Sequence, residues 1–238
     1  MFFKKKIVVT GGTGRFAQSF KKIKSKYKFI YPKRKSLDIS KVKSIKNFLK
    51  KQRPESVLHL AGLSRPMSIH DKNINKSIDL NIIGTANLVK VCSDLRIKLI
   101  YFSTSYVYPG RKGNYRENDA VLPWNNYAWS KLGGESAVQM YKNSLILRVC
   151  MTEKPFLHKK AFANVKLNFI FHDELSKILI KLLNKKGVIN LGGPTRTVYS
   201  FAKKYNKNVR KIYVKKNSIY NFPLKPFMNL SKLKKIIN

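Results

Sequence analysis

A short apolar strand that runs straight into a glycine turn most constrains what this chain can fold into. Ile7–Val9 is a β-branched run, typical of a buried central strand. Gly11 permits a tight turn, Gly14 lets the backbone approach a ligand, and Ala17 lets the next helix pack closely on the strand. Because the N–H groups at the start of a helix attract anions, the turn suits a diphosphate. The alternative is a plain strand-to-helix turn with Gly-x-x-Gly-x-x-Ala spacing.

Strand and helix patterns alternate after this turn. The periodicity of apolar residues predicts helices at 16–26, 41–51, 75–94 and from 126 onward, with strands at 27–31, 56–62, 99–102 and 145–149. We expect Ser40 to cap the second helix. Beyond residue 149 the pattern weakens, and it predicts only a helix at 171–184, a strand at 187–191 and a short helix at 231–237. The alternation predicts an α/β fold, a Rossmann-type doubly wound parallel sheet with helices on both faces.

The chain carries a formal net charge of +39, which raises the question of nucleic-acid binding. Its lysines are spread over the whole length, with neither a confined basic arm nor an aromatic-interleaved patch. We therefore expect no specific nucleic-acid partner, only attraction to polyanions at low salt. A polyanion-binding protein is the alternative that charge alone supports.

Cysteine and histidine provide no metal site in this sequence. Two cysteines form neither a disulfide framework nor a metal-binding spacing. The scattered histidines are each expected to be hydrogen-bonded in the core or exposed; they are His59, His70, His158 and His172. No apolar segment is long enough to cross a membrane, and the N-terminus does not read as a signal peptide, so a cytoplasmic protein is expected.

Three cations follow the second predicted strand, at Lys33, Arg34 and Lys35. NAD-binding units commonly place an acidic residue here for the ribose hydroxyls, whereas cations suit a 2′-phosphate. The sequence therefore favours NADP, with NAD as the alternative. Asp38, slightly further on, is expected either near the adenine or as a helix cap.

Tyr127 and Lys131 are four residues apart on a predicted helix and so share one of its faces. Thr104 ends the preceding strand, and parallel strand ends meet at one edge of a sheet, so we expect it near Tyr127. A phenol of ordinary pKa, about 10, is a poor acid at neutral pH, but a nearby ammonium lowers that pKa. A neighbouring hydroxyl can polarise a carbonyl. The set predicts proton transfer, and an ordinary amphipathic helix is the alternative.

Six motifs in this order resemble the extended short-chain dehydrogenase/reductase superfamily, which includes NAD-dependent epimerases and dehydratases. They are Thr10–Gly14, Leu37–Ile39, His59–Gly62, Asn81–Thr85, Phe102–Ser105 and Tyr127–Glu135. Within it, the chain is most similar to the dTDP-4-dehydrorhamnose reductase family. That family's Ser-Thr-Asp-Tyr-Val-Phe, Tyr-x-Glu-x-Asp and terminal Arg-Pro segments are similar to residues 103–108, 115–119 and 225–233.

The resemblance implies an NADP(H)-preferring sugar-nucleotide reductase that transfers hydride to a 4-keto hexose linked to a nucleoside diphosphate. It implies that Tyr127 protonates the keto oxygen, Lys131 binds the nicotinamide ribose and lowers the pKa of Tyr127, and Thr104 holds the keto oxygen. The implied cofactor-binding residues are Tyr127 and Lys131 together with Gly11, Thr13, Gly14, Arg15, Phe16, Arg34, Asp38, Ile39, Ala61 and Gly62.

The same resemblance implies an NAD(P)-binding Rossmann domain at 1–149 that includes the Tyr127 helix. A reduced C-terminal substrate-binding part would occupy 150–238, interleaved with the last sheet strands. Superfamily members often pair through the helices that carry Asn81 and Tyr127, so a homodimer is compatible with the sequence.

Two departures from the family pattern bear on the reaction. Ser105 stands where the family has an aspartate and where dehydratases carry an acid pair, which disfavours dehydration. The segment between Arg148 and His172 is much shorter than in the family. Two alternatives therefore stay open: an NAD-dependent sugar-nucleotide epimerase, and a non-catalytic NAD(P)-binding partner subunit like the regulatory subunit of methionine adenosyltransferase.

Overall fold

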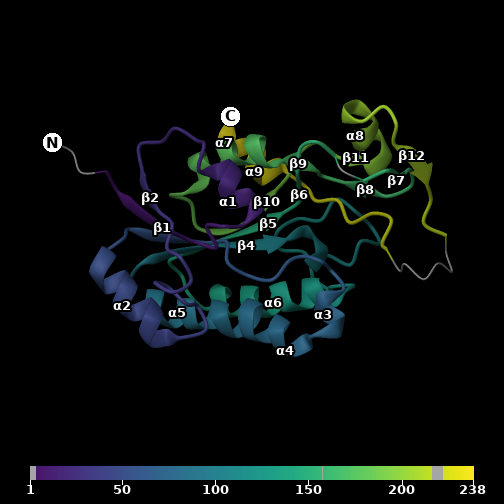
Figure 1. Ribbon diagram of the computed structural model, residues 1–238. Helices are drawn as coiled ribbons and strands as arrows, with labels where there is room; N and C mark the ends of the chain where they lie inside the picture. Colours follow the sequence, from purple (N-terminus) through teal and green to yellow (C-terminus); the bar gives the residue numbers. More distant parts are fainter. Residues whose placement is uncertain (1–3, 157, 216–221) are drawn as a thin grey trace. The chain divides into compact units, whose positions relative to one another are not determined.

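The computed structural model describes residues 4–156, 158–215 and 222–238 (Figure 1). Its first elements in chain order are β1 Lys6–Thr10, α1 Arg15–Phe20, β2 Lys28–Ile30, α2 Val42–Gln52, β3 Ser56–His59, α3 Ile69–Lys72, α4 Ile74–Ser77, α5 Gly84–Asp94, β4 Lys98–Thr104 and α6 Asn126–Gln139. They are followed by β5 Ser144–Val149, β6 Met151–Thr152, β7 Lys160–Phe162, β8 Lys166–Leu167, β9 Ile170–Phe171, α7 His172–Leu182, β10 Gly187–Leu191, β11 Arg196–Thr197, α8 Val198–Tyr205, β12 Arg210–Ile212 and α9 Ser231–Ile237.

The chain forms two compact units, and it passes between them several times. The first unit comprises Met1–Ser103, Asn126–Leu147 and Leu183–Val188. The second comprises Thr104–Asn125, Arg148–Leu182 and Ile189–Asn238. Each unit is described by itself below.

A six-stranded sheet with the strand order β10-β5-β4-β3-β1-β2 is the main sheet of the molecule. β1 pairs in parallel with both β2 and β3, and β3 pairs in parallel with β4. Parallel neighbours need crossover connections, which the intervening helices provide. The predicted α/β fold of Rossmann type is confirmed.

One face of the strands in the first unit packs against α2, α5 and α6 (Figure 1). Side chains alternate between the two faces of a strand, so Val8, Val57 and Leu99 point to this side together. They belong to a buried cluster with Leu88 of α5 and Val138 of α6. Each such side chain contributes about 1.5–3 kcal/mol to folding through burial.

The short helix α1 packs through aromatic residues. The ring of Phe16 lies 5.1 Å from that of Phe102 on β4, and the ring of Phe20 lies 4.9 Å from that of Phe29 on β2. The predicted helix at 16–26 was too long, because α1 ends at Phe20. After it, the backbone forms successive turns among lysines that offer no apolar face.

Ser40 does not cap α2, in contrast to the prediction. The residue that precedes α2 is Lys41, which makes no side-chain cap hydrogen bond. The hydroxyl of Ser40 instead donates to Asp38 Oδ1 at 2.8 Å, and the amide of Ser40 donates to the same oxygen at 3.0 Å. Asp38 therefore closes a local turn and takes the hydroxyl that a cap would have used.

The long helix predicted at 75–94 is interrupted by a π-helical turn, Ile78–Ile83, between α4 and α5. Asn81 lies within this turn and is 1% exposed. Its side-chain amide donates to the carbonyl of Leu63 at 2.9 Å and to Ser130 Oγ at 2.8 Å, and its oxygen accepts from the amide of Leu63 at 2.6 Å. The π-turn thus ties α6 to the segment that follows β3.

Among its described residues, the second unit contains three two-stranded pairings, β6 with β9, β7 with β12, and β8 with β11. Its helices are α7, α8 and α9. Phe201 of α8 packs 5.0 Å from Phe171, which also meets Tyr205 at 4.7 Å. Neither α8 nor these strands were predicted from the sequence, and the strands, at two or three residues each, are too short to show a periodicity. Thr197, whose Oγ1 accepts from the amide of Ser200, caps α8.

A buried polar network holds the long loop 105–125 inside the second unit. Arg148, only 4% exposed, donates to the hydroxyl of Tyr108 at 2.8 Å and to the carbonyl of Glu117 at 3.0 Å. Tyr108 in turn donates to Asn190 Oδ1 at 2.8 Å and stacks on Tyr115 at 4.9 Å. These hydrogen bonds fix Tyr108 and Glu117 of the loop within the unit.

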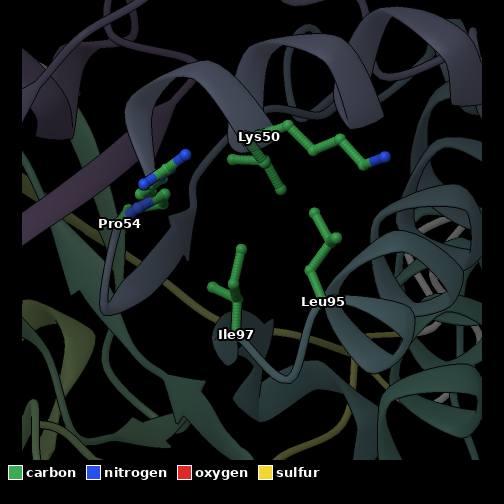
Figure 2. Close-up of a pocket in the computed structure, with 6 residues that line it drawn as sticks. Lys50, Pro54, Leu95 and Ile97 are labelled. Atoms are coloured by element: carbon green, nitrogen blue, oxygen red, sulfur yellow. The ribbon is translucent and has the colours of Figure 1, made fainter.

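A hollow of about 400 Å³ lies between the carboxyl ends of α2 and α5 (Figure 2). Its lining is largely apolar, with two cations, and comprises Leu49, Lys50, Arg53, Pro54, Leu95 and Ile97. Pro54 lies two residues before the first residue of β3, and Ile97 directly precedes β4. The hollow is therefore at the opposite edge of the sheet from the glycine turn.

Candidate active site

The glycine turn after β1 adopts a backbone that needs glycine. Gly11 has φ +69°, and a Cβ at this position would lie 2.5 Å from the backbone nitrogen of Ala61. The amide of Gly14 donates to the carbonyl of Gly11 at 2.9 Å, which closes the turn. Gly14 precedes α1 without any side-chain cap, and Thr13, Gly14 and Arg15 are exposed. The turn therefore presents backbone to a ligand, as a phosphate site requires.

Ala61 and Gly62 follow β3 and lie beside this turn. The amide of Ala61 donates to Thr10 Oγ1 at 3.2 Å, which fixes the end of β3 against the end of β1. Gly62 is exposed, and a Cβ there would lie 2.8 Å from Asn81 Oδ1. The structure brings the small residues of both strand ends together at one edge of the sheet.

The residues expected on the adenosine side lie after β2. Arg34 is exposed and forms a 3.6 Å ion pair with Asp38. Hydrogen bonds from Ser40, and the charge of Arg34, lower the pKa of the Asp38 carboxyl. Ile39 is 7% exposed and belongs to the apolar core of the first unit.

Tyr31 is a candidate site residue that was not predicted from the sequence. Its side chain lies against Gly12, whose added Cβ would lie 3.1 Å from Cδ1 of the ring, and the ammonium of Lys21 is 4.9 Å from the ring centroid. The hydroxyl is buried and has no hydrogen-bond partner among the described residues. Burial raises the pKa of Tyr31 to about 12, so the hydroxyl stays a donor. A buried donor without a partner at the edge of the turn fits a site that a polar ligand completes.

Helix α6 carries both Tyr127 and Lys131 in the first unit. Lys131 is 8% exposed, and its ammonium lies 4.2 Å from the ring centroid of Tyr101 on β4. The hydroxyl of Tyr101 donates to the backbone carbonyl of Lys131 at 2.9 Å. Burial lowers the pKa of Lys131 to about 7, although the nearby Glu135 carboxylate acts in the opposite direction. A buried ammonium one helical turn from a half-buried tyrosine is an unusual and costly arrangement.

Thr104 belongs to the second unit, where it ends β4. It is 5% exposed, and its Oγ1 accepts from the amide of Tyr106 at 3.3 Å within a 3-10 turn, Ser105–Val107. The neighbouring Ser105 hydroxyl is buried and has no hydrogen-bond partner in the described part of the chain. The predicted position of Thr104 at the end of a strand is confirmed.

His59 is part of a buried series of hydrogen bonds that runs from Asn81 to Thr10, the residue before the glycine turn. Thr85 donates to the carbonyl of Asn81 at 2.8 Å, so its oxygen accepts from His59 Nε2 at 3.1 Å. His59 Nδ1 is left as an acceptor for Thr10 Oγ1 at 2.8 Å. Burial, with a further contribution from Lys131, lowers the pKa of His59 to about 3, which keeps the imidazole neutral. His59 is a hydrogen-bonded core histidine, as expected.

His70 is a second residue that sequence reasoning did not single out for this site. It is 1% exposed, and its ring centroid lies 5.2 Å from that of Tyr127. A lone histidine in a poorly periodic segment gives no signal of such a contact. Among the described residues, no group of three or more His, Cys, Asp or Glu side chains could hold a metal. Nor does any helix in the described ranges have the length and apolar character of a membrane span.

The arrangement in the first unit combines two chemical capabilities. An uncapped glycine turn with small residues beside it can bind the diphosphate of a dinucleotide. A tyrosine with a buried lysine one turn along α6 can supply a proton. The residues present therefore fit a nicotinamide dinucleotide.

Comparison with known proteins places this geometry in a family. The model of the RmlD substrate binding domain matches residues 5–165. The β subunit of methionine adenosyltransferase 2 from Xenopus laevis is 29% identical over 155 residues. That match covers 61% of this chain and 46% of the relative, so the chain spans less than half the length of this curated relative.

Solved structures share the fold at low sequence identity. A dTDP-4-dehydrorhamnose reductase of Bacillus anthracis, in complex with NADP, has a TM-score of 0.86 at 20% identity and covers 98% of this chain and 93% of its own. A UDP-glucuronic acid 4-epimerase of Bacillus cereus, in complex with UDP-glucuronic acid and NAD, has a TM-score of 0.75 at 21% identity, with 97% and 92% covered. Because the family model matches well over half of the residues, this chain belongs to the RmlD substrate binding domain family of the extended short-chain dehydrogenase/reductases.

Proposed function

We propose that this protein is an NADP(H)-preferring sugar-nucleotide reductase that reduces a 4-keto hexose linked to a nucleoside diphosphate. The observation that carries the proposal is the buried ammonium of Lys131 one turn from Tyr127 on α6. Burying a lysine ammonium costs several kcal/mol, so a chain that keeps one buried is expected to use it. Family membership and the NADP-bound structural neighbour support the same reaction class.

We assign the dinucleotide to the glycine turn and the ends of β2 and β3. Gly11, Thr13, Gly14, Arg15 and Phe16 would hold its diphosphate. Arg34 would bind the 2′-phosphate, with Asp38 and Ile39 beside the adenine, and Ala61 and Gly62 would line the rest. When bound, NADPH supplies the hydride.

The protein side chains supply the proton that the reduction requires. Tyr127 donates its phenol proton to the keto oxygen of the substrate. The ammonium of Lys131 stabilises the phenolate that remains and binds the nicotinamide ribose. Ser105 offers no carboxylate for dehydration chemistry.

Cofactor binding tests the proposal without knowledge of the substrate. We expect the purified protein to bind NADPH with micromolar Kd in moderate salt, and NADH more weakly, as measured by cofactor fluorescence. Gly14→Asp should weaken NADPH binding at least tenfold, because its carboxylate repels the diphosphate. Gly14 has φ −66°, so aspartate causes no backbone strain there. Ser93→Asp adds the same charge at an exposed position of α5 and should leave binding unchanged.

Binding of neither cofactor to the folded protein would contradict the proposal. Cofactor binding without reduction of any keto sugar nucleotide would favour the second candidate, a non-catalytic NAD(P)-binding partner subunit, which the similarity to a methionine adenosyltransferase β subunit supports. The epimerase alternative differs in stoichiometry, since only a reductase consumes NADPH continuously when a keto sugar nucleotide is supplied.

A further inference from the structure

His70 is a buried imidazole packed against the ring of Tyr127. The two ring planes meet at 61°, an edge-to-face contact, with centroids 5.2 Å apart. Such contacts have a preferred geometry. His70 therefore restricts the orientation of the Tyr127 ring.

Ser77 in turn fixes the orientation of the imidazole. Its Oγ lies 2.7 Å from His70 Nδ1, and Ser77 is itself 3% exposed at the end of α4. His70 Nε2 has no hydrogen-bond partner within the described residues. Among the described residues, the imidazole is therefore held by a hydrogen bond at Nδ1 alone.

The neighbouring residues of α3 and α6 form a second tie. Asn126, which begins α6, donates to Asp71 Oδ1 at 2.8 Å. Two successive residues of α3 thus contact two successive residues of α6. The Asp71 bond is exposed and joins two side chains, whereas the His70 contact is buried and reaches the phenol ring.

We propose that His70 is a positioning residue for Tyr127, and that Ser77 holds His70 in the orientation this requires. The catalytic part of the inference rests on the proposed function, since it assigns the proton transfer to Tyr127. Proton transfer depends on near-attack geometry, and a displacement of about 1 Å can cost 10²-fold in rate. A rigid aromatic edge against the phenol ring provides that geometry in the first turn of α6.

The charges around His70 are consistent with this role. Asp71 and Lys131 are the charged groups that act on it, and Tyr127 is its titratable neighbour. Burial lowers the pKa of His70, Lys131 adds to this, and Asp71 opposes it. The imidazole is therefore neutral at physiological pH, where it packs without placing a charge beside the phenol.

The catalytic test uses variants that distinguish three effects: loss of the His70 ring, loss of its nitrogens, and loss of the Asp71 bond between α3 and α6. With a keto sugar nucleotide, we expect His70→Ala to lower kcat 10- to 100-fold while the Kd for NADPH changes less than twofold. The double variant His70→Phe with Ser77→Ala restores an aromatic edge and leaves no unpaired polar partner, so it should recover most of kcat. Asp71→Ala should lower kcat no more than threefold, and Lys72→Ala, an exposed neighbour on α3, should have no effect.

A spectroscopic readout does not depend on turnover. In protein labelled with ¹³Cζ-tyrosine, the NMR signal of Tyr127 is assigned as the one that disappears in Tyr127→Phe. We expect His70→Ala to shift and broaden this signal, and Lys72→Ala to leave it in place. If no keto sugar is reduced by the wild-type protein, the proposed function fails while this measurement still decides the positioning.

Two results would overturn the inference. An unchanged Tyr127 signal in His70→Ala would show that the imidazole does not orient the phenol. An equal loss of kcat in Asp71→Ala and His70→Ala would show that docking of α3 as a whole, rather than the imidazole, positions Tyr127. Thermal unfolding of every variant, measured in parallel, identifies any loss that comes from misfolding.

Discussion

Lys131 is a residue whose charged form is disfavoured by its buried surroundings. It is buried beneath the ring of Tyr101, and Glu135 on the next turn is the acid that acts on it. In the unfolded chain a lysine has a pKa of about 10.5. The folded pKa of about 7 means that folding favours the uncharged amine. The side chain that the proposed chemistry needs is thus one that lowers stability.

This burial makes a prediction about pH. Between pH 7 and 10.5 the unfolded chain binds one more proton at Lys131 than the folded chain, so the free energy of unfolding rises with pH in this window. Its contribution is about 1.4 kcal/mol per pH unit. We expect Lys131→Met to flatten the rise between pH 7.5 and 9.5 by roughly 2 kcal/mol, measured by urea unfolding. Lys46→Met, at an exposed position of α2, is the control and should leave the slope as in wild type.

At the scale of elements, the π-helical turn between α4 and α5 sets the position of Asn81. It places Asn81 where three hydrogen bonds reach Leu63 and Ser130. Those partners flank the cofactor side of β3 and the helix that carries Tyr127. One amide therefore couples the two segments that we propose to bind the dinucleotide.

Removal of this amide should cost more than the loss of a single hydrogen bond. Asn81→Ala leaves the amide and carbonyl of Leu63 without their partner, and we expect it to lower the free energy of unfolding by about 2–4 kcal/mol. Asn87→Ala removes one bond, from Nδ2 to the carbonyl of Ile39 at 3.1 Å, and should cost about 1 kcal/mol. Equal costs for the two variants in urea unfolding would contradict the role given to Asn81.

At the scale of the whole molecule, the net charge of +39 dominates the electrostatics. Ion pairs in the described ranges include that of Lys5 with Glu55 at 3.0 Å, in which both side chains are exposed. Such pairs contribute little to stability. The charge therefore acts mainly on association with anions, including phosphate-bearing ligands.

Attraction to DNA should consequently be strong only at low salt. We expect affinity for a fluorescent duplex, measured by polarisation, to fall about 10³-fold or more between 50 and 200 mM salt. The loss should be the same for unrelated sequences, because only phosphates are contacted. Sequence-dependent binding that survives at 150 mM salt would instead support the polyanion-binding alternative.

Much of the first unit was predictable, because long apolar strands and helices have periods that the sequence displays. β5 and α6 lie where the patterns placed them, as does α9 of the second unit, and the Gly11 turn has the backbone that its glycine suggested. The early end of α1 was not predictable, since a lysine-rich stretch can continue a helix or leave it. The short strands and α8 of the second unit were missed because their packing, rather than a local pattern, defines them.

The sequence by itself determined the Rossmann-type alternation, the glycine turn and the Tyr127–Lys131 pair, since each depends on residues that are close together in the chain. Only the tertiary structure decided that Lys131 is buried under Tyr101, that Asn81 joins α6 to the end of β3, and that His70 packs on Tyr127. These contacts join residues 18 to 57 positions apart. Burial, unpaired polar atoms and shifted pKa values arise from such contacts, because they depend on which surfaces exclude water after folding.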